Sequence, residues 1–354
     1  MRLEGISIGQ LPRGGRGVKP RNDVSSTEKF NDGSGATAAP EIKTFITSVL
    51  TEAIPFIDGV APKAGGASTW KTKGSPRKFA NSEAPVHLYE RTVAGKDLDK
   101  IEGLSQFSAD RRDETWFCRK STHRNTAEKG TASWEEFTHS FKDHHAESED
   151  AFTPTVIGAR QAISWDTNGI EVEAQGGRWI NISVVVEEMK HKIDPKPLKN
   201  RTFPVVQVSA ELAGVQEFVV VSIPLTDFDK SPYAEFARDK SLVVAAYTSV
   251  ERIRILPSNG DIEWIMATAS NAGGVLPQWM QNLAVPSAVA KDVDMFLAWI
   301  PSQRQAAPIS KTTSGNKDLP AAPSDSVPPP ISKTEGEVPG TDTTGKDLPA
   351  TPVA

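Results

Sequence analysis

Short strand-like runs follow one another through the middle of this chain of 354 residues. About eight of them can be recognised, enough for one large antiparallel sheet. The runs are Val86–Val93, Thr115–His123, Val156–Trp165, Arg178–Lys190, Phe203–Ala210, Val215–Leu225, Leu242–Leu256 and Ile262–Ser270. The fold therefore has to accommodate an extensive sheet, and the remaining elements have to pack on it.

Helical patterns precede and interrupt these runs. Apolar residues in Glu41–Val60 are spaced as one face of an amphipathic helix, namely Ile42, Phe45, Ile46, Val49, Leu50, Ala53 and Ile54. Ser133 stands three residues before Glu136, the spacing of a capping box, and apolar Trp134, Phe137 and Phe141 follow on one face. A short helix is therefore expected between the second and third strand-like runs.

A long amphipathic helix is predicted after the last strand-like run. The helical turn Leu276–Leu283 follows a hinge at Gly273 and Gly274, and the apolar stripe then continues to Ile300. Pro286 either kinks this helix or marks a second start. Its apolar face needs a partner, and a sheet curved around the helix provides one. The residues expected to pack on the concave sheet face are Trp279, Leu283, Val293, Phe296 and Leu297.

The two ends of the chain are poor in apolar residues. Residues 11–40 are rich in Gly, Ser, Pro, Asn and charge, and residues 305–354 repeat short Pro-Ile-Ser-Lys-Thr and Lys-Asp-Leu-Pro-Ala segments. Such segments cannot bury enough surface to offset the entropy of ordering. The expected organisation is a disordered segment over 1–40, one domain over 41–304, and a disordered low-complexity tail over 305–354. That tail is either a neutral product of duplication or a docking segment for a protein partner.

Charge and cysteine content exclude several classes of function. The formal net charge of −5 gives no global attraction for nucleic acid, so no nucleic-acid partner is expected. Cys118 is the only cysteine, which rules out an intramolecular disulfide and favours a cytoplasmic location. Met1–Gln10 carries no signal-peptide or myristoylation pattern. The longest apolar stretch, Phe218–Leu225, is too short to span a membrane, so any membrane contact would be peripheral.

Candidate catalytic and metal-binding groups each have a simpler explanation. His139, His144 and His145 precede Glu147 and Glu149, but the i+5 step from His139 to His144 does not fit one helical face. A solvated polar face is expected there. Cys118 lies in a Trp-Phe-Cys run typical of a buried, inert thiol. The glycine pairs lack the context that nucleotide binding requires. No metal, cofactor or catalytic residue is therefore predicted.

Charged residues inside the strand-like runs are the more informative feature. Side chains alternate along a strand, so three sets each share a face: Phe117, Arg119, Ser121 and His123; Tyr247, Ser249 and Glu251; and Trp264, Met266, Thr268 and Ser270. If these faces point inward, Arg119 and Glu251 could pair in the interior, because an unpaired buried charge is costly. If they point outward, or a bulge shifts the alternation, both side chains reach solvent.

Several segments resemble a known family. Gly274–Pro286, which reads GVLPQWMQNLAVP, resembles the segment that opens the closing helix of START (StAR-related lipid transfer) domains. Further segments resemble signatures of a fungal family of unknown function assigned to the START-like superfamily; they are Trp116–His123, Gly130–Phe137, Tyr247–Arg252 and Trp264–Gly274. The resemblance covers residues 41–304. It implies an α+β helix-grip fold, in which a curved antiparallel sheet surrounds a long C-terminal helix and an internal apolar cavity.

The resemblance, together with the lack of a catalytic pattern, favours ligand binding over catalysis. The leading hypothesis is a carrier or sensor of a lipid, sterol or other apolar small molecule. One alternative is a cyclase- or aromatase-type enzyme acting on a polyketide or terpenoid, with Arg119, Glu251 or His123 supplying acid–base chemistry. Another is a scaffold whose cavity is closed, with a volume well below ~300 Å³. The residues expected to line the cavity are Arg119, Tyr247, Glu251, Trp264, Met266, Thr268, Trp279, Leu283 and Phe296.

Overall fold

The computed structural model describes residues 5–20, 28–30, 35–61, 66–95, 113–274 and 278–306, and a single sheet dominates this part of the chain. Its strands are β1 (Gly15–Gly17), β2 (Glu28–Phe30), β3 (Lys71–Thr72), β4 (His87–Val93), β5 (Glu114–His123), β6 (Val156–Ser164), β7 (Val172–Ala174), β8 (Gly177–His191), β9 (Arg201–Leu212), β10 (Glu217–Pro224), β11 (Val243–Val244), β12 (Ala246–Ile255) and β13 (Ile262–Asn271). Every strand-like run predicted from the sequence corresponds to a strand of this sheet.

The order of the strands brings distant segments together. It runs β2-β1-β6-β8-β9-β10-β12-β13-β5-β4-β3, while β7 pairs with β8 and β11 pairs with β9. The pairings are antiparallel apart from the short parallel contact of β11 with β9. As a result, β5 lies beside β13 and one strand away from β12, so residues 114–123 meet residues 246–271.

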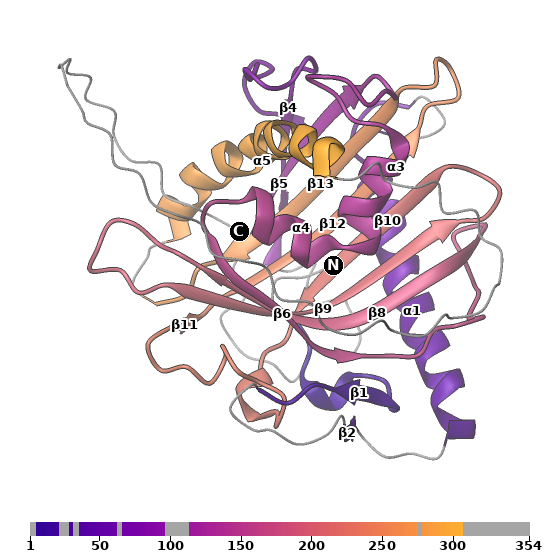
Figure 1. Cartoon of the computed structure of the whole chain (residues 1–354), viewed down its shortest axis with the longest axis vertical. Helices are drawn as coiled ribbons and strands as arrows, with labels where there is room; N and C mark the ends of the chain where they lie inside the picture. The colour runs from indigo at the N-terminus through magenta and orange to yellow at the C-terminus, as the bar shows by residue number, and fades with distance from the viewer. Residues whose placement is uncertain are drawn as a thin grey trace, which may run out of the picture.

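Helices cover both faces of the sheet (Figure 1). One face carries α1 (Gly35–Asp58); the other carries α3 (Trp134–Phe137), the π-helical stretch η2 (Thr138–Asp143), α4 (His145–Phe152) and α5 (Gln278–Ala306). Alternate side chains of each strand face the two layers: Cys118 and Ile265 pack with α1, whereas Phe117 and Trp264 pack with α5. The sheet therefore has a hydrophobic core on each side.

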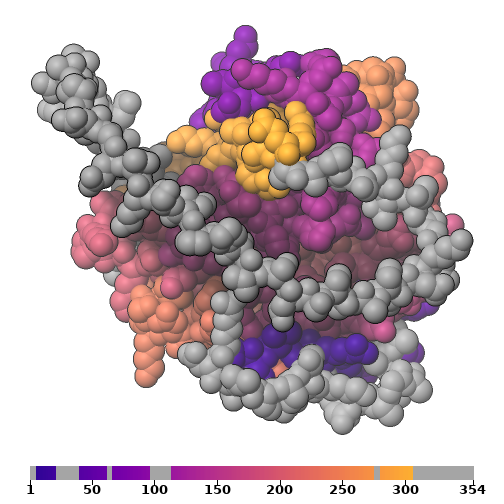
Figure 2. Space-filling model, viewed as in Figure 1, coloured from indigo at the N-terminus to yellow at the C-terminus, as the bar shows by residue number. Residues whose placement is uncertain are grey.

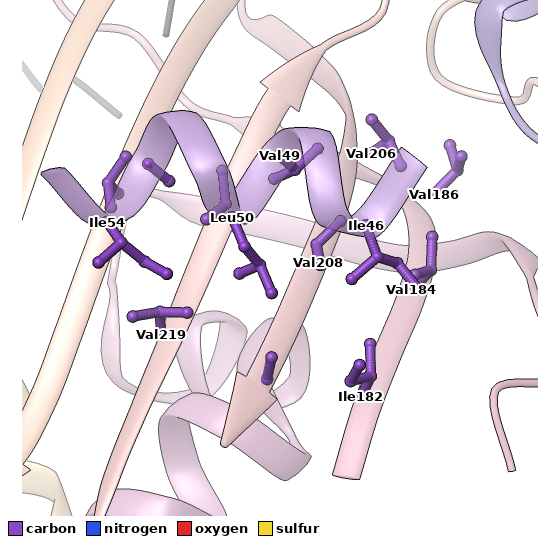
Figure 3. Packing of buried hydrophobic residues seen from close by; sticks show 14 of the residues in the cluster. Ile46, Val49, Leu50, Ile54, Ile182, Val184, Val186, Val206, Val208 and Val219 are labelled. Atoms are coloured by element: carbon purple, nitrogen blue, oxygen red, sulfur yellow. The ribbon is translucent and has the colours of Figure 1, made fainter. Parts of the chain in front are cut away.

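The packing of α1 confirms the predicted N-terminal amphipathic helix. Figure 3 shows Ile46, Leu50 and Ile54 directed at valines of the sheet, among them Val208 and Val219. The three helical residues are each four positions apart, so they lie on one face, and all are buried. Each contributes about 1.5 to 3 kcal/mol through burial, which is what attaches this helix to the sheet.

The packing of α5 confirms the helix-grip arrangement. A buried stripe runs along this helix and packs on the sheet face opposite α1; its members are Val285, Val289, Ala290, Val293, Phe296, Leu297 and Ile300. Arg304 near the end of α5 donates to Glu136 of α3 at 2.6 Å and 2.9 Å, which ties the closing helix to the inserted helices. In the space-filling view, α5 and the inserted helical segment lie against one another on one face of the molecule (Figure 2).

The prediction for Leu283 is wrong. Its side chain is 72% exposed and does not line the cavity on the α5 side of the sheet. In this first part of α5 the inward side chain is Gln281, which accepts a hydrogen bond from the backbone N–H of Ala272 at 2.7 Å. Residues two apart on a helix point about 200° apart, so Leu283 faces solvent. The side chain of Trp279 lies outside the described residues.

Part of the N-terminal segment predicted to be disordered is instead ordered on the sheet. β1 pairs with β6 through Gly17 and Ile163, and Leu11 is 4% exposed within the α1-side core. The Trp165 indole N–H donates to the carbonyl of Pro12 at 3.0 Å, and the backbone N–H of Ile6 donates to Pro224 at 2.9 Å. The expected boundary at residue 41 therefore excludes residues that contribute to the core.

We predict that Leu11→Ala lowers the free energy of unfolding by about 2 to 3 kcal/mol, because it removes a buried leucine and leaves a cavity. Urea unfolding of the full chain measures this. Val18→Ala is the matched control, since Val18 is 48% exposed and its truncation should change stability by less than about 0.5 kcal/mol. Equal, small effects of the two substitutions would show that residues 5–18 do not stabilise the domain.

The predicted tail over 305–354 lies outside the described residues except for its first two positions, which continue α5. Within the described part of the chain, no helix is long and apolar enough to cross a membrane.

Candidate functional site

A cavity of about 70 Å³ lies on the α5 side of the sheet, between the strands and helices α4 and α5. Its wall combines aromatic and thioether side chains with ionisable ones. The lining residues are Arg119, Phe141, His145, Glu149, Phe152, Thr153, Thr155, Met189, His191, Tyr247, Ser249, Glu251, Met266, Thr268 and Asp292. They come from β5, β8, β12 and β13 on one side and from η2, α4, its flanking loop and α5 on the other.

Arg119 and Glu251 face inward and form an ion pair. Met266 is the register partner of both Arg119 on β5 and Glu251 on β12, so the three side chains form one row across the sheet. Arg119 Nη2 donates to Glu251 Oε1 at 3.1 Å, and the two side chains are only 2% and 6% exposed. The alternation of side chains allowed Arg119 and Glu251 to point either inward or to solvent, and in the structure both point inward.

Trp264 lies behind this pair and helps to hold it. The Arg119 guanidinium lies 3.8 Å from the centre of the Trp264 ring, a cation–π contact, and the indole N–H donates to Glu251 Oε1 at 2.5 Å. Arg119 Nε and Nη1 are buried and make no hydrogen bond with any described residue. Since arginine has five N–H donors and stays charged, part of its donor capacity remains available at the cavity.

Helix α4 brings His145 and Glu149 to the cavity, which corrects the prediction of a solvated polar face. His145 Nε2 lies 3.7 Å from Glu251 Oε2, and His145 Nδ1 lies 3.8 Å from Glu149 Oε2. Burial lowers the pKa of His145, but the interaction with Glu251 and the nearby carboxylates of Glu149 and Glu187 outweigh it and raise that pKa to about 9. His145 is therefore the second cation at the cavity at neutral pH.

The π-helical turn brings together the two histidines whose i+5 spacing does not fit an α-helical face. His144 N–H donates to the His139 carbonyl at 3.0 Å, an i+5 bond, and the two rings lie 4.5 Å apart. In an ordinary α-helix this spacing does not place side chains on one face, whereas a π-helical stretch does. No group of three His, Cys, Asp or Glu side chains among the described residues is arranged to hold a metal ion.

Carboxyl groups at and near the cavity have raised pKa values. Burial raises the pKa of Asp292 to about 8, with Glu149 and Glu251 raising it further and Arg119 lowering it. Burial likewise raises the pKa of Glu187 to about 7, despite the opposing charge of His145. Burial and the proximity of Glu251 raise the pKa of Glu149 as well. Carboxyl groups thus outnumber the basic groups that could neutralise them.

We predict that Asp292 makes the protein less stable as pH rises. Its folded-state pKa of about 8 lies above the ordinary value of 3.8, so the stabilising contribution is complete below pH 3.8 and is lost as the pH rises towards 8. Asp292→Asn keeps a neutral side chain at every pH. In thermal unfolding at pH 5, 6.5 and 8, the midpoint of Asp292→Asn relative to that of the wild type should increase as the pH rises. The midpoint of the exposed control Asp150→Asn relative to the wild type should not change with pH. A difference that does not change with pH would contradict the shifted pKa.

Five of the residues predicted for the cavity line it, namely Arg119, Tyr247, Glu251, Met266 and Thr268. Trp264 and Phe296 are fully buried behind the wall and do not line it. The strand faces predicted the sheet side of the cavity correctly, since residues of β5, β12 and β13 alternate as expected. Residues of the helical side and of β8 were missed, including Phe141, His145, Phe152, Asp292 and Met189.

Two residues discussed as reactive groups lie away from the cavity. His123 does not line the cavity. Its Nε2 atom is hydrogen-bonded to the Ser121 hydroxyl at 2.8 Å, and burial lowers the pKa of His123 to about 3. Cys118 faces the α1 side and is completely buried. Burial raises the pKa of its thiol well above the ordinary range, as expected for an inert structural cysteine.

Comparison with models of protein families identifies a family to which this chain belongs. Residues 116–300, more than half of the chain, match the model of a family described as a protein of unknown function (DUF3074). The chain belongs to this family. The matched segment runs from β5 into α5, and it therefore includes both charged strands and the closing helix. A search of curated protein sequences finds no match.

Solved human structures with a similar arrangement include three START proteins. Human STARD10 is 13% identical, with a TM-score of 0.44 over 72% of this chain and 82% of its own. Human StAR-related lipid transfer protein 5 is 12% identical, with a TM-score of 0.41 over 72% of this chain and 97% of its own. The lipid transfer and protein localization domain of human StarD13 (DLC2) is 11% identical, with a TM-score of 0.39 over 71% of this chain and 98% of its own.

Proposed function

We propose that this chain is a cytoplasmic carrier or sensor that binds an amphipathic small molecule, with the polar end of the ligand in the cavity beside Arg119. The observation that supports this most directly is the pair of unused donors on Arg119, whose side chain is 2% exposed. A buried donor without a partner costs free energy in the empty protein. An oxygen atom of a ligand would satisfy it, and the aromatic and methionine side chains around it would contact the adjoining apolar atoms.

The size of the cavity limits how much of the ligand it holds. The cavity volume of about 70 Å³ is enough for a small polar group but not for a whole lipid. Pockets for drug-sized ligands run from about 300 Å³ upwards. Glu149 and Asp292 are 27% and 29% exposed, which marks the opening between α4 and α5. An attached apolar chain would leave through this opening, and we infer that α4 and α5 separate to admit it.

Native mass spectrometry of the full chain purified from its own host tests the proposal. The wild type should carry a bound small molecule. The double variant Arg119→Met with Glu251→Leu should lose it, because the polar anchor is gone while the buried volume is nearly kept. Arg124→Met is the matched control, since Arg124 is about half exposed and lies outside the cavity. Equal occupancy in all three proteins would contradict the role of Arg119.

A second candidate is the non-catalytic scaffold with a closed cavity, and the small volume is the observation that favours it. A scaffold would carry no bound molecule in any of the three proteins and would bind no added amphiphile. The cyclase or aromatase alternative loses one of its three acid–base candidates, because His123 does not line the cavity. The remaining two, Arg119 and Glu251, are bonded to each other.

A further inference from the structure

A second cavity, of about 410 Å³, lies on the α1 side of the sheet, on the face opposite the cavity described above. It lies between the end of α1 at Ile54 and Asp58, the β7–β8 turn at Gln175, and the β9–β10 turn at Leu212 and Val215. We call it the hairpin pocket. Its volume is within the range of about 300 to 1,000 Å³ that is typical of binding pockets.

The two turns that form the hairpin pocket are packed against each other. Gln175 and Gly176 make a two-residue turn between the paired residues Ala174 and Gly177, and both have positive φ angles, of 52° and 74°. A Cβ atom on Gly177 would lie 2.5 Å from Leu212 Cδ1, so the missing side chain lets the β9–β10 turn pack on the β7–β8 turn. The wall of the pocket is therefore formed by the fold itself.

One part of the hairpin pocket is apolar. Ile54 and Trp179 are buried in the core on the α1 side, and Leu212 is half-buried. Val215 is 57% exposed and lies at the edge of the same pocket. An aliphatic side chain that entered here would contact Ile54, Leu212 and Val215 and remove apolar surface from water.

The polar part of the hairpin pocket presents acceptors. The Asp58 carboxylate accepts a hydrogen bond from the buried Arg252 and remains partly exposed. Gln175 Nε2 donates to the carbonyl of Thr51 at 3.0 Å, which leaves the Oε1 acceptor of the same side chain available. A ligand with N–H donors would satisfy both oxygen atoms.

The cation that lines the hairpin pocket is already neutralised. Arg178 Nη1 donates to Glu171 at 3.0 Å, and Arg178 is also the register partner of Glu173 across β7 and β8. With Asp58, three carboxyl groups lie at or beside the pocket. The hairpin pocket therefore suits a ligand that combines an aliphatic group with a cationic donor.

The C-terminal tail contains a segment of this chemistry. Pro330–Thr334 reads Pro-Ile-Ser-Lys-Thr, and it lies outside the described residues. Ile331 and Lys333 are two residues apart, so in an extended chain their side chains point to the same side. Pro328, Pro329 and Pro330 precede them and restrict the backbone to an extended form.

Chain length allows this segment to reach the hairpin pocket. The chain from Ala306, the last residue of α5, to Pro330 spans up to about 80 Å when extended. A compact domain of about 250 residues has a radius of gyration of only about 18 Å. The first copy of the motif, Pro308–Thr312, does not have this reach, because Ile309 lies within about 10 Å of Ala306. Two packing layers of about 10 Å each separate α5 from α1, so the first copy stays on the α5 side.

We propose that the tail segment Pro330–Thr334 binds in the hairpin pocket of its own chain. Ile331 contacts Ile54, Leu212 and Val215, and Lys333 Nζ lies beside the Asp58 carboxylate. This contact does not depend on ligand binding in the cavity on the α5 side. A tethered segment is present at an effective concentration of about millimolar, so a weak interaction is enough to keep it bound.

Crosslinking in the full chain tests this contact through the variant Val215→Cys with Ser332→Cys. Cys118 does not interfere, because it is completely buried and burial raises its thiol pKa well above the ordinary range. A short bis-maleimide should join the two new thiols at least about tenfold faster than in the control Val244→Cys with Ser332→Cys. Val244 is also exposed, at 45%, but lies at the other end of β9 from Leu212. Equal rates in the two proteins would overturn the proposal.

The repeated motif supplies matched variants. In the Val215→Cys and Ser332→Cys background, Ile331→Asp and Lys333→Glu should each lower the crosslinking rate to that of the control. Ile309→Asp, the same substitution in the first copy, should leave the rate unchanged. A rate that falls with Ile309→Asp and not with Ile331→Asp would overturn the assignment to Pro330–Thr334.

The mass of the crosslinked product distinguishes the tail of the same chain from that of a second copy. The product should be a monomer, and its rate of formation should not depend on protein concentration. Crosslinked dimers that become fewer on dilution would show that a second copy provides the segment, and would overturn the intramolecular arrangement.

A labelled synthetic peptide with the sequence of residues 328–334 gives an independent measurement by fluorescence anisotropy. It should bind the full-chain variant Ile331→Asp, whose own segment no longer competes, with a Kd of about 0.1 to 1 mM. Binding should be at least about tenfold weaker when Val215→Asp is added, because a carboxylate then replaces an apolar contact and Val215 is exposed enough to be changed without loss of the core. Equal binding to the two variants would overturn the assignment to the hairpin pocket.

Discussion

Replacing Phe296 with alanine is expected to lower the free energy of unfolding by about 3 to 5 kcal/mol. Phe296 on α5 is completely buried, and its ring centre lies between 4.8 Å and 6.3 Å from those of five other aromatic residues. These are Phe137, Phe141, Phe152, Trp264 and Trp299. The substitution removes contacts with α3, η2, α4 and the sheet at once, and since Phe296 does not line the cavity, a ligand cannot fill the gap.

Urea unfolding of the full chain measures this effect. Met280→Ala is the control on the same helix, because Met280 is 45% exposed and its truncation should change stability by less than about 0.5 kcal/mol. Phe141 and Phe152 contact Phe296 and also line the cavity, so Phe296→Ala should weaken ligand binding too. A loss below about 1 kcal/mol would show that α5 is not held on the sheet through this cluster.

The sheet side of the site was predictable because strand alternation is a strict rule. Once Thr115–His123 is a strand, Arg119 must share a face with Phe117, and the same holds for Glu251 with Tyr247. The sequence does not indicate which face is inward, since both faces of the central strands are covered by helices. The register that places Met266 between Arg119 and Glu251 depends on β5 pairing with β13, a contact between segments over 100 residues apart.

The helical side was missed because its position depends on packing between distant segments. His145 and Glu149 are four residues apart on α4, and they reach the cavity because this helix packs on the sheet, which their spacing alone does not reveal. The sequence gives little indication that Asp292 lines the cavity, since this residue is next to Val293 and three residues after Val289, at the edge of the apolar stripe. A charged residue at such an edge is usually solvated, and only the position of Arg119 makes it part of a site.

The prediction of disorder for the N-terminal segment was wrong in part because it was based on composition alone. Its composition is typical of disorder, yet its glycines permit a close approach that larger residues would prevent. A Cβ atom on Gly17 would lie 2.3 Å from the Tyr233 ring, and one on Gly15 would lie 2.8 Å from the Trp165 ring. Both distances are shorter than any real contact. These two glycines therefore allow β1 to pack closely against Trp165 and Tyr233, a tertiary constraint that composition alone does not reveal.

The buried ion pair supports the other prediction with a large effect. Glu251→Leu should cost about 3 to 5 kcal/mol, because it leaves the 2% exposed Arg119 and the nearby His145 without their shared carboxylate. Arg119→Met should cost less, since Glu251 keeps His145 and the Trp264 N–H as partners. The double variant should be more stable than Glu251→Leu alone, because no unpaired arginine remains and His145 can lose its proton.

A double-mutant cycle by urea unfolding at pH 7 measures the coupling, expected at about 1 to 3 kcal/mol. The matched control is the pair Lys73 and Glu90, which are joined at 2.6 Å but 39% and 36% exposed. Their coupling should stay below about 1 kcal/mol, because water screens an exposed pair. If the two single effects of the buried pair simply add, Arg119 and Glu251 do not stabilise each other in solution.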